Sequence, residues 1–197
     1  MILPIVAYGD PILKKKAQEI DEKFEGLNTL IDHMFETMYD ARGVGLAAPQ
    51  INQSIRLFIV DASPFAEREE DEELDEKAIG LENFKKVFIN AVIEEEKGDE
   101  WGFNEGCLSI PNIREEVIRK PFIKISYYDE NWNFHEDYYE GYAARVIQHE
   151  YDHIEGILFT DKISPLKRKL LQKRLLNISK GIVDVDYKMK FPTLKRR

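Results

Sequence analysis

Residues 148–156 read QHEYDHIEG and contain the metal-binding pattern H-E-x-x-H. On an α-helix, positions i and i+4 lie about 40° apart around the axis, so His149 and His153 can present their imidazoles to one cation. Glu150 lies about 100° from His149 around the same axis, which is where a general base for a metal-bound water belongs. The pattern therefore predicts a catalytic metal site on a helix.

The neighbouring residues favour this site over an ordinary solvated helix face. Apolar residues recur at helical spacing through the segment, at Ala143, Val146, Ile147, Tyr151 and Ile154. This periodicity places much of the helix in a core. Two histidines and a glutamate on such a helix need partners, because an unpaired buried charge is costly or shifts its pKa.

A third protein ligand is not supplied downstream of this helix. A zinc protease of the metzincin type would have a histidine at the position that Phe159 occupies here. A thermolysin-like protease would use a glutamate roughly twenty residues beyond the second histidine, and residues 171–177 contain no carboxylate. Both protease arrangements therefore fail, and the third ligand must come from upstream.

Cys107 is the only cysteine of the chain. A lone cysteine is by default a small buried hydrophobe, but Gly106 beside it allows close backbone approach, and the Ser and Pro that follow indicate an irregular turn. Two histidines and one cysteine leave one coordination position open, as in catalytic sites. The other histidines, His33 and His135, lie among polar residues and are expected at the surface.

Three segments, in this order, resemble the motifs of the peptide deformylases. They are GVGLAAPQ at residues 43–50, EGCLS at residues 105–109 and QHEYDH at residues 148–153. YGDP at residues 8–11 is similar to the start of that family, so the resemblance covers most of residues 1–165. It implies a metallohydrolase that removes the formyl group from the N-terminal formyl-methionine of newly synthesised polypeptides.

The resemblance also implies the ligand set and the cofactor. Cys107, His149 and His153 would hold one divalent metal, which is Fe(II) in the family. Zn, Ni or Co would accept the same ligands. Glu150 would take a proton from the metal-activated water and pass it to the departing amine.

Gln50 and Leu108 match the family positions that stabilise the oxyanion. The Gln50 side chain and the Leu108 backbone N–H would donate to the carbonyl oxygen as it becomes negative, and such donors are worth roughly 3 to 4 kcal/mol each. Gly43 and Gly45 suit the loop before Gln50, because glycine permits positive φ and close backbone approach to a peptide.

Further family positions concern the substrate and the surroundings of the metal. Residues that match substrate-binding positions are Val44, Gly45, Gly106, Arg114 and Val146. Arg145 departs from the aliphatic residue expected at its position. Glu105 and Arg119 are predicted to form an ion pair that stiffens the ligand loop. Gln148 and Asp152 are candidates either for contacts behind the ligands or for an exposed helix surface.

Two other functions agree with parts of the pattern. A zinc endopeptidase would also use H-E-x-x-H, but Phe159 and the missing downstream glutamate disfavour it. A non-catalytic binding protein stabilised by a metal would have no use for Glu150 or Gln50. A peptide deformylase instead requires Cys107 as a ligand and a formyl group as the substrate.

Length and composition agree with one catalytic domain over residues 1–197. The motifs at 43–50 and 148–153 belong to one site, so no domain boundary can separate them. No apolar run approaches the roughly 20 residues needed to cross a membrane, and residues 1–8 lack the basic start of a signal peptide. A single cysteine suits a reducing compartment. We therefore expect a cytoplasmic monomer with no membrane partner.

Hydrophobic periodicity predicts the elements around the metal helix. A helical period marks residues 27–38, and a last helix is expected over about 164–179. Strand patterns cover residues 56–60, 87–93, 114–118, 122–128 and 134–139. Strands without βαβ alternation indicate an α+β fold, with mostly antiparallel sheets packed around a central metal-binding helix and with a C-terminal helix.

Charge is unevenly distributed along the chain. Residues 65–77, within an acidic surface insert at about 62–80, are too charged to form a core. From Asp161 onward there are 12 Lys/Arg and 3 Asp/Glu, whereas the first 160 residues carry 16 and 34. An apolar stripe in the last helix is predicted at Leu166, Leu170, Leu171 and Leu175. The basic helix and tail, 161–197, are expected either to dock on the acidic body or to contact ribosomal RNA.

Overall fold

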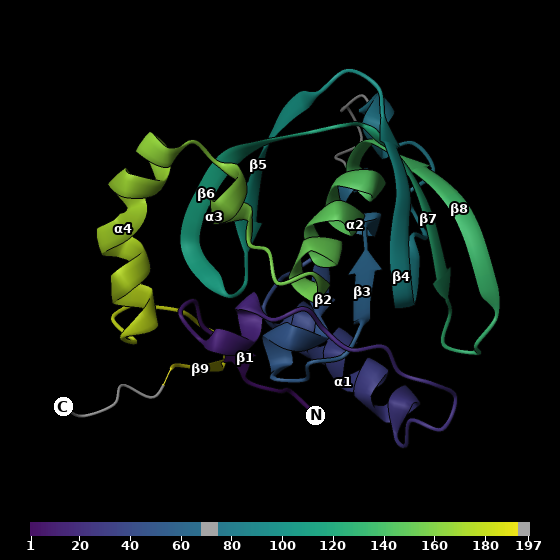
Figure 1. Ribbon diagram of the computed structural model, residues 1–197, viewed down its shortest axis with the longest axis horizontal. Helices are drawn as coiled ribbons and strands as arrows, with labels where there is room; N and C mark the ends of the chain where they lie inside the picture. Colours follow the sequence, from purple (N-terminus) through teal and green to yellow (C-terminus); the bar gives the residue numbers. More distant parts are fainter. Residues whose placement is uncertain (68–74, 193–197) are drawn as a thin grey trace.

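The structure is a computed structural model that describes residues 1–67 and 75–192 (Figure 1). Its largest sheet has five antiparallel strands in the order β2-β3-β4-β7-β8. These strands are β2 (Gly45–Ala47), β3 (Leu57–Asp61), β4 (Lys85–Lys97), β7 (Phe122–Tyr128) and β8 (Phe134–Glu140). Branched and aromatic residues dominate β3, whose five residues are all buried, as is usual for a central strand.

Two helices cover the two faces of this sheet. Successive side chains of a strand point to opposite faces. Leu57 of β3 therefore packs with α1 (Leu27–Asp40), whereas its neighbour Phe58 packs with α2 (Gly141–Ile154). The sheet thus lies between two apolar cores, and α2 is held by one of them.

A hairpin lies on the other side of α2. It consists of β5 (Trp101–Cys107) and β6 (Ile110–Arg119), which pair antiparallel, and α2 lies between this hairpin and the five-stranded sheet (Figure 1). The hairpin also packs against α3 (Phe159–Lys162) and α4 (Pro165–Ser179), through a third apolar core. The helix that carries the two histidines is therefore enclosed on both sides.

The two ends of the described chain meet in a short parallel pair. β1 (Ile5–Val6) pairs with β9 (Met189–Lys190) next to the hairpin. Single-turn 3-10 helices connect the larger elements, and they are η1 (Pro11–Lys14), η2 (Ala48–Ile51), η3 (Ser63–Ala66) and η4 (Glu76–Ala78).

The predicted α+β fold, with mostly antiparallel sheets around the metal helix, is confirmed. Each predicted strand corresponds to an observed one, although β4 and β6 are longer than predicted. β5 is not predicted, because Gly102, Asn104 and Gly106 occupy alternate positions and weaken the strand pattern. Cys107 is therefore the last residue of a strand, and only the two residues after it form the predicted turn.

The predicted apolar stripe of α4 is partly wrong. Leu171 and Leu175 are buried against the hairpin, together with Ile178. Leu166 and Leu170 are 69% and 74% exposed, because successive residues lie about 100° apart around the helix axis and these two are on a different side from Leu171 and Leu175.

Part of the predicted acidic insert, residues 68–74, and the end of the basic tail, residues 193–197, lie outside the described residues. Within the described part of the chain, no helix has the length and apolar character needed to cross a membrane.

The contribution of the apolar core around α2 to stability can be tested at Phe88. Phe88 is fully buried, and its ring stacks on Phe58 with 4.7 Å between the ring centroids. We expect Phe88→Ala to lower the free energy of unfolding by about 3–5 kcal/mol, because it leaves a cavity. The control is Phe134→Ala, at a residue that is 60% exposed, which should cost about 1 kcal/mol or less. Urea unfolding measures both, and equal losses would contradict this description of the core.

Candidate active site

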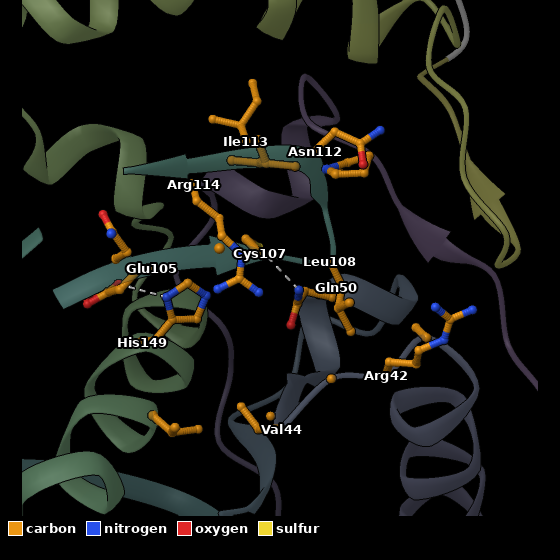
Figure 2. Close-up of a pocket in the computed structure, with 18 of the residues that line it drawn as sticks. Arg42, Val44, Gln50, Glu105, Cys107, Leu108, Asn112, Ile113, Arg114 and His149 are labelled. Carbon is orange, nitrogen blue, oxygen red and sulfur yellow. Dashed lines mark hydrogen bonds and ion pairs between the residues drawn. The ribbon is translucent and has the colours of Figure 1, made fainter. Parts of the chain in front are cut away.

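Three side chains from two elements meet between the hairpin and α2. Cys107 ends β5, while His149 and His153 lie one turn apart on α2. One donor atom from each lies within 4.8 Å of the other two, and Cys107 Sγ is 3.4 Å from His153 Nε2. Figure 2 shows Cys107 and His149 among the residues that line a cavity. The three form a candidate metal-binding triad.

The surroundings of the triad fit a divalent cation. One thiolate and two imidazoles are ligands that suit Fe, Zn, Ni and Co. Glu150 is buried beside them, and its Oε2 atom has no hydrogen-bond partner among the described residues. Burial raises the pKa of the Glu150 carboxyl to about 7. A buried carboxyl oxygen without a partner is expected where a bound water or substrate would supply the missing contact.

Gly45 is required by the close approach of Glu150. A Cβ atom on Gly45 would lie 2.4 Å from Glu150 Oε1, so no other residue fits without moving the carboxylate. Neither Gly43 nor Gly45 adopts the positive φ that glycine permits. At Gly43 the missing Cβ leaves room for the Leu108 side chain, which would otherwise lie at 2.8 Å. The loop therefore uses these glycines for close packing rather than for an unusual backbone conformation.

Gln50 points its amide nitrogen toward the triad. Its Oε1 accepts a hydrogen bond from the Ala47 backbone N–H at 2.9 Å. Its Nε2 lies 3.3 Å from Ser109 Oγ and 3.5 Å from Cys107 Sγ (Figure 2). Because the side-chain oxygen of Gln50 is bound by the Ala47 backbone N–H, the side-chain NH₂ group faces the triad.

The Glu105 carboxylate joins the hairpin to α2. Arg119 binds it through two nitrogens, from Nε to Oε1 at 2.7 Å and from Nη2 to Oε2 at 2.9 Å. His149 Nδ1 lies 2.9 Å from Oε2 (Figure 2). Burial opposes ionisation, but these hydrogen bonds hold the pKa of Glu105 well below its usual range. The predicted ion pair of Glu105 and Arg119 is therefore present, and it leaves the other nitrogen of His149 for a cation.

Asp152 extends this network, whereas Gln148 does not. Arg119 Nη1 donates to Asp152 Oδ2 at 2.7 Å. Gln148 Nε2 instead donates to Glu96 Oε1 at 2.7 Å and to the Lys120 carbonyl at 3.2 Å. Of these two candidates, only Asp152 is connected to the residues behind the ligands.

Arg145, the departure from the expected aliphatic residue, is buried and bound by the hairpin. Its Nη1 donates to Glu105 Oε1 at 3.1 Å and to the Val117 carbonyl at 2.9 Å, and its Nη2 donates to the Trp101 carbonyl at 2.8 Å. The guanidinium also lies 4.4 Å from the centre of the Trp101 ring. Arg145 therefore adds a second cation to Glu105, although it also borders the cavity.

A cavity of about 1000 Å³ opens over the triad. All five residues that match substrate-binding positions line it, namely Val44, Gly45, Gly106, Arg114 and Val146. Gln50, Leu108, Glu105, His149 and Glu150 line it as well, whereas His153 and Arg119 lie behind it. His33 and His135 take no part in this site, and His135 binds Asp129 at 2.9 Å.

Sequence reasoning missed three parts of the cavity wall. They are Arg42, the aromatic pair Phe65 and Phe103, and residues 184–187. Phe103 was hidden by the weak strand pattern of β5. For residues 184–187 a signal existed, because Val183, Val185, Tyr187 and Met189 alternate with charged residues as in a half-buried strand.

Comparisons with known proteins agree with this geometry. The family model described as Polypeptide deformylase matches residues 2–169. The chain is similar to the peptide deformylase of Christiangramia forsetii, with 59% identity over 100% of this chain and 99% of the relative. It is also similar to that of Flavobacterium psychrophilum, with 56% identity over 100% of both chains. The crystal structure of a peptide deformylase from Legionella pneumophila superposes with a TM-score of 0.76, at 37% identity over 92% of this chain and 98% of that one.

The buried ion pairs of Glu105 predict that substitutions of two neighbouring cationic residues, Arg119 and Lys120, change the stability of the protein by very different amounts. Arg119→Met would leave the Glu105 and Asp152 carboxylates without their main partner. Breaking a buried ion pair in this way costs about 3–5 kcal/mol. The matched control is Lys120→Met, at an exposed side chain, which should change stability by about 0.5 kcal/mol or less. Urea unfolding at equal metal content tests this expectation, and a small effect of Arg119→Met would show that the network contributes little.

Proposed function

The chain belongs to the peptide deformylase family, whose members remove the formyl group from nascent polypeptides, and we propose how its own side chains carry out this reaction. The observation that carries the proposal is the meeting of Cys107, His149 and His153 beside the buried Glu150, next to a cavity that Cys107, His149 and Glu150 line. The zinc endopeptidase and the non-catalytic binding protein are not favoured by the family match.

Cys107, His149 and His153 would hold one divalent metal. The bound cation would supply a Lewis acid and would lower the pKa of a coordinated water toward 7. The family resemblance favours Fe(II), and the ligand set is also suited to Zn, Ni or Co. Glu105 supports this assignment, because it orients the His149 ring through Nδ1.

Glu150 is the proposed proton carrier. Its carboxylate lies next to the triad, against the backbone of Gly45, and one of its oxygens is free to bind water. It would accept the proton of the attacking water and later give it to the amine nitrogen that leaves the formyl carbon. Because Gly45 has no Cβ atom, the carboxylate can occupy this position beside the triad, where it could take part in both transfers.

Gln50 Nε2 and the Leu108 backbone N–H are the proposed oxyanion donors. Both residues line the cavity, and the Gln50 amide is oriented by Ala47. As the formyl oxygen gains negative charge during attack, fixed donors aimed at it stabilise the transition state more than the ground state.

The methionine side chain of the substrate is expected to occupy the apolar part of the cavity. Val44 and Val146 provide apolar surface there, and Gly45 and Gly106 let the peptide backbone approach closely. Arg114 is exposed at the same wall, where it can contact the following residues of the peptide. Arg145 also lines the cavity, and its guanidinium is paired with Glu105 and with two carbonyls of the hairpin.

We also propose that residues 1–197 act as one catalytic domain, as a monomer in the cytoplasm. Support comes from the β1–β9 pair, which joins residues 5–6 to residues 189–190 beside the site. The single cysteine suits a reducing compartment.

The exposed side of α4 is the proposed contact with ribosomal RNA. Arg168 and Lys167 pair with Asp161 and Glu115, so these two cations help to dock the helix. Lys169 and Lys173 are exposed and make no ion pair among residues 1–67 and 75–192. Free cations on one face are available to phosphate groups.

Glu150→Gln tests the proton carrier. We expect the variant to retain its metal, because Glu150 is not a ligand, and to lose about 10²- to 10⁴-fold in kcat on formyl-Met-Ala. The control is Glu140→Gln, at an exposed residue just before α2, which should behave as the parent. Metal analysis and steady-state kinetics measure the two properties. Metal loss from Glu150→Gln would mean that Glu150 is a ligand, and cleavage of an unformylated peptide by the parent would favour an endopeptidase.

The double variant Lys169→Glu/Lys173→Glu tests the RNA contact. We expect it to weaken salt-sensitive ribosome binding and to flatten the dependence of log affinity on log salt by somewhat under one unit for each lost phosphate contact. Activity on formyl-Met-Ala should be unchanged, since α4 contributes nothing to the cavity wall. The control Lys15→Glu/Lys23→Glu changes the same charge at exposed positions outside α4. Parent-like ribosome binding by the α4 variant would refute the contact.

A further inference from the structure

After α4 the chain runs back along the cavity wall and enters β9 (Figure 1). We name residues 183–190 the C-terminal strap. Its alternate residues Val183, Val185, Tyr187 and Met189 are half-buried, whereas the charged residues between them are exposed. The strap lies beyond the segment that the family model matches, which ends at residue 169.

The strap is bound to both walls of the cavity mouth. The Tyr187 hydroxyl donates to the Leu108 carbonyl at 2.7 Å. The Asn112 side-chain amide donates to the Asp184 carbonyl at 3.0 Å. On the opposite wall, Arg42 forms an ion pair with Asp186.

Tyr187 holds the turn that follows the proposed metal ligand. Cys107 pairs with Ile110, so Leu108 and Ser109 are the two residues of a tight turn between β5 and β6. The Leu108 carbonyl is bound by Tyr187, and the Ser109 carbonyl accepts the Tyr8 backbone N–H at 2.8 Å. Tyr8 and Tyr187, from segments far apart in the chain, therefore fix two successive peptide units of this turn.

Fixing the Leu108 carbonyl also restricts the Leu108 N–H. Each peptide unit is planar, so two dihedral angles at Leu108 set the orientation of its N–H relative to its carbonyl. Once the carbonyl is held by a hydrogen bond and Cys107 is held at the end of β5, little freedom remains for the N–H between them. Donors to an oxyanion must be held in place before the charge develops.

We infer that Tyr187 is a positioning residue for deformylation, which acts on the reaction through Leu108. This inference rests on the proposed function, because it assigns a task to the Leu108 N–H as an oxyanion donor. A strap that only sealed the cavity would need an apolar side chain at position 187, and the hydroxyl would contribute nothing to the reaction.

Tyr187→Phe removes only the hydroxyl and keeps the ring in its apolar contacts. We expect kcat on formyl-Met-Ala to fall about 10-fold or more, while KM changes little, because the lost interaction acts in the transition state. Metal content and melting temperature should stay close to those of the parent. Hydrogen exchange at the Leu108 amide should become faster, and this readout does not depend on activity.

Tyr138→Phe is the matched control, because it removes a hydroxyl from a residue that is 63% exposed. It should leave kcat and the exchange of the Leu108 amide unchanged. An active parent whose Tyr187→Phe variant keeps both kcat and Leu108 protection would overturn the inference alone. A joint change of kcat, KM and melting temperature would also overturn it, since that is the result of a merely structural role. A parent without deformylase activity would overturn the proposed function, and the inference with it.

Discussion

The site depends on the ion pairs and hydrogen bonds that surround the buried carboxylate of Glu105. A charge in this position costs solvation energy, and only close opposite charges and hydrogen bonds offset that cost. Arg119 and Arg145 supply the charges, one from β6 and one from α2, and His149 adds a further contact. Because these groups belong to the hairpin and the helix, the same interaction that stabilises the carboxylate also fixes the distance between Cys107 and the two histidines.

Packing on the other side of α2 positions the proposed proton carrier, Glu150. The helix packs against the five-stranded sheet, and the backbone of Gly45 in β2 contacts Glu150. The carboxylate is thereby buried without a partner on one oxygen, next to the triad and open to the cavity. Two opposing contacts, the hairpin on one side and β2 on the other, place the ligands and the proposed proton carrier relative to each other.

The two ends of the described chain complete the arrangement. β1 and β9 pair beside the turn at Leu108, and each end supplies one hydrogen bond to a carbonyl of that turn. A two-residue turn satisfies few of its own polar groups, so outside partners decide how rigid it is. The segments that close the fold thus also hold the backbone next to the proposed ligand Cys107.

The sequence by itself determined the helix with His149, Glu150 and His153, because helical geometry is local and a spacing of four residues is enough to place two side chains on one face. It also indicated the α+β fold and the candidate third ligand, since hydrophobic periodicity and a single cysteine can be read without coordinates. It did not reveal β5, whose glycines hide the strand pattern. It also did not reveal that Gly45 is needed for the close approach of Glu150, or that residues 184–187 form part of the cavity wall. Only the tertiary structure decided these, because each depends on contacts between segments far apart in the chain, and no local pattern of residues records which distant backbone will approach.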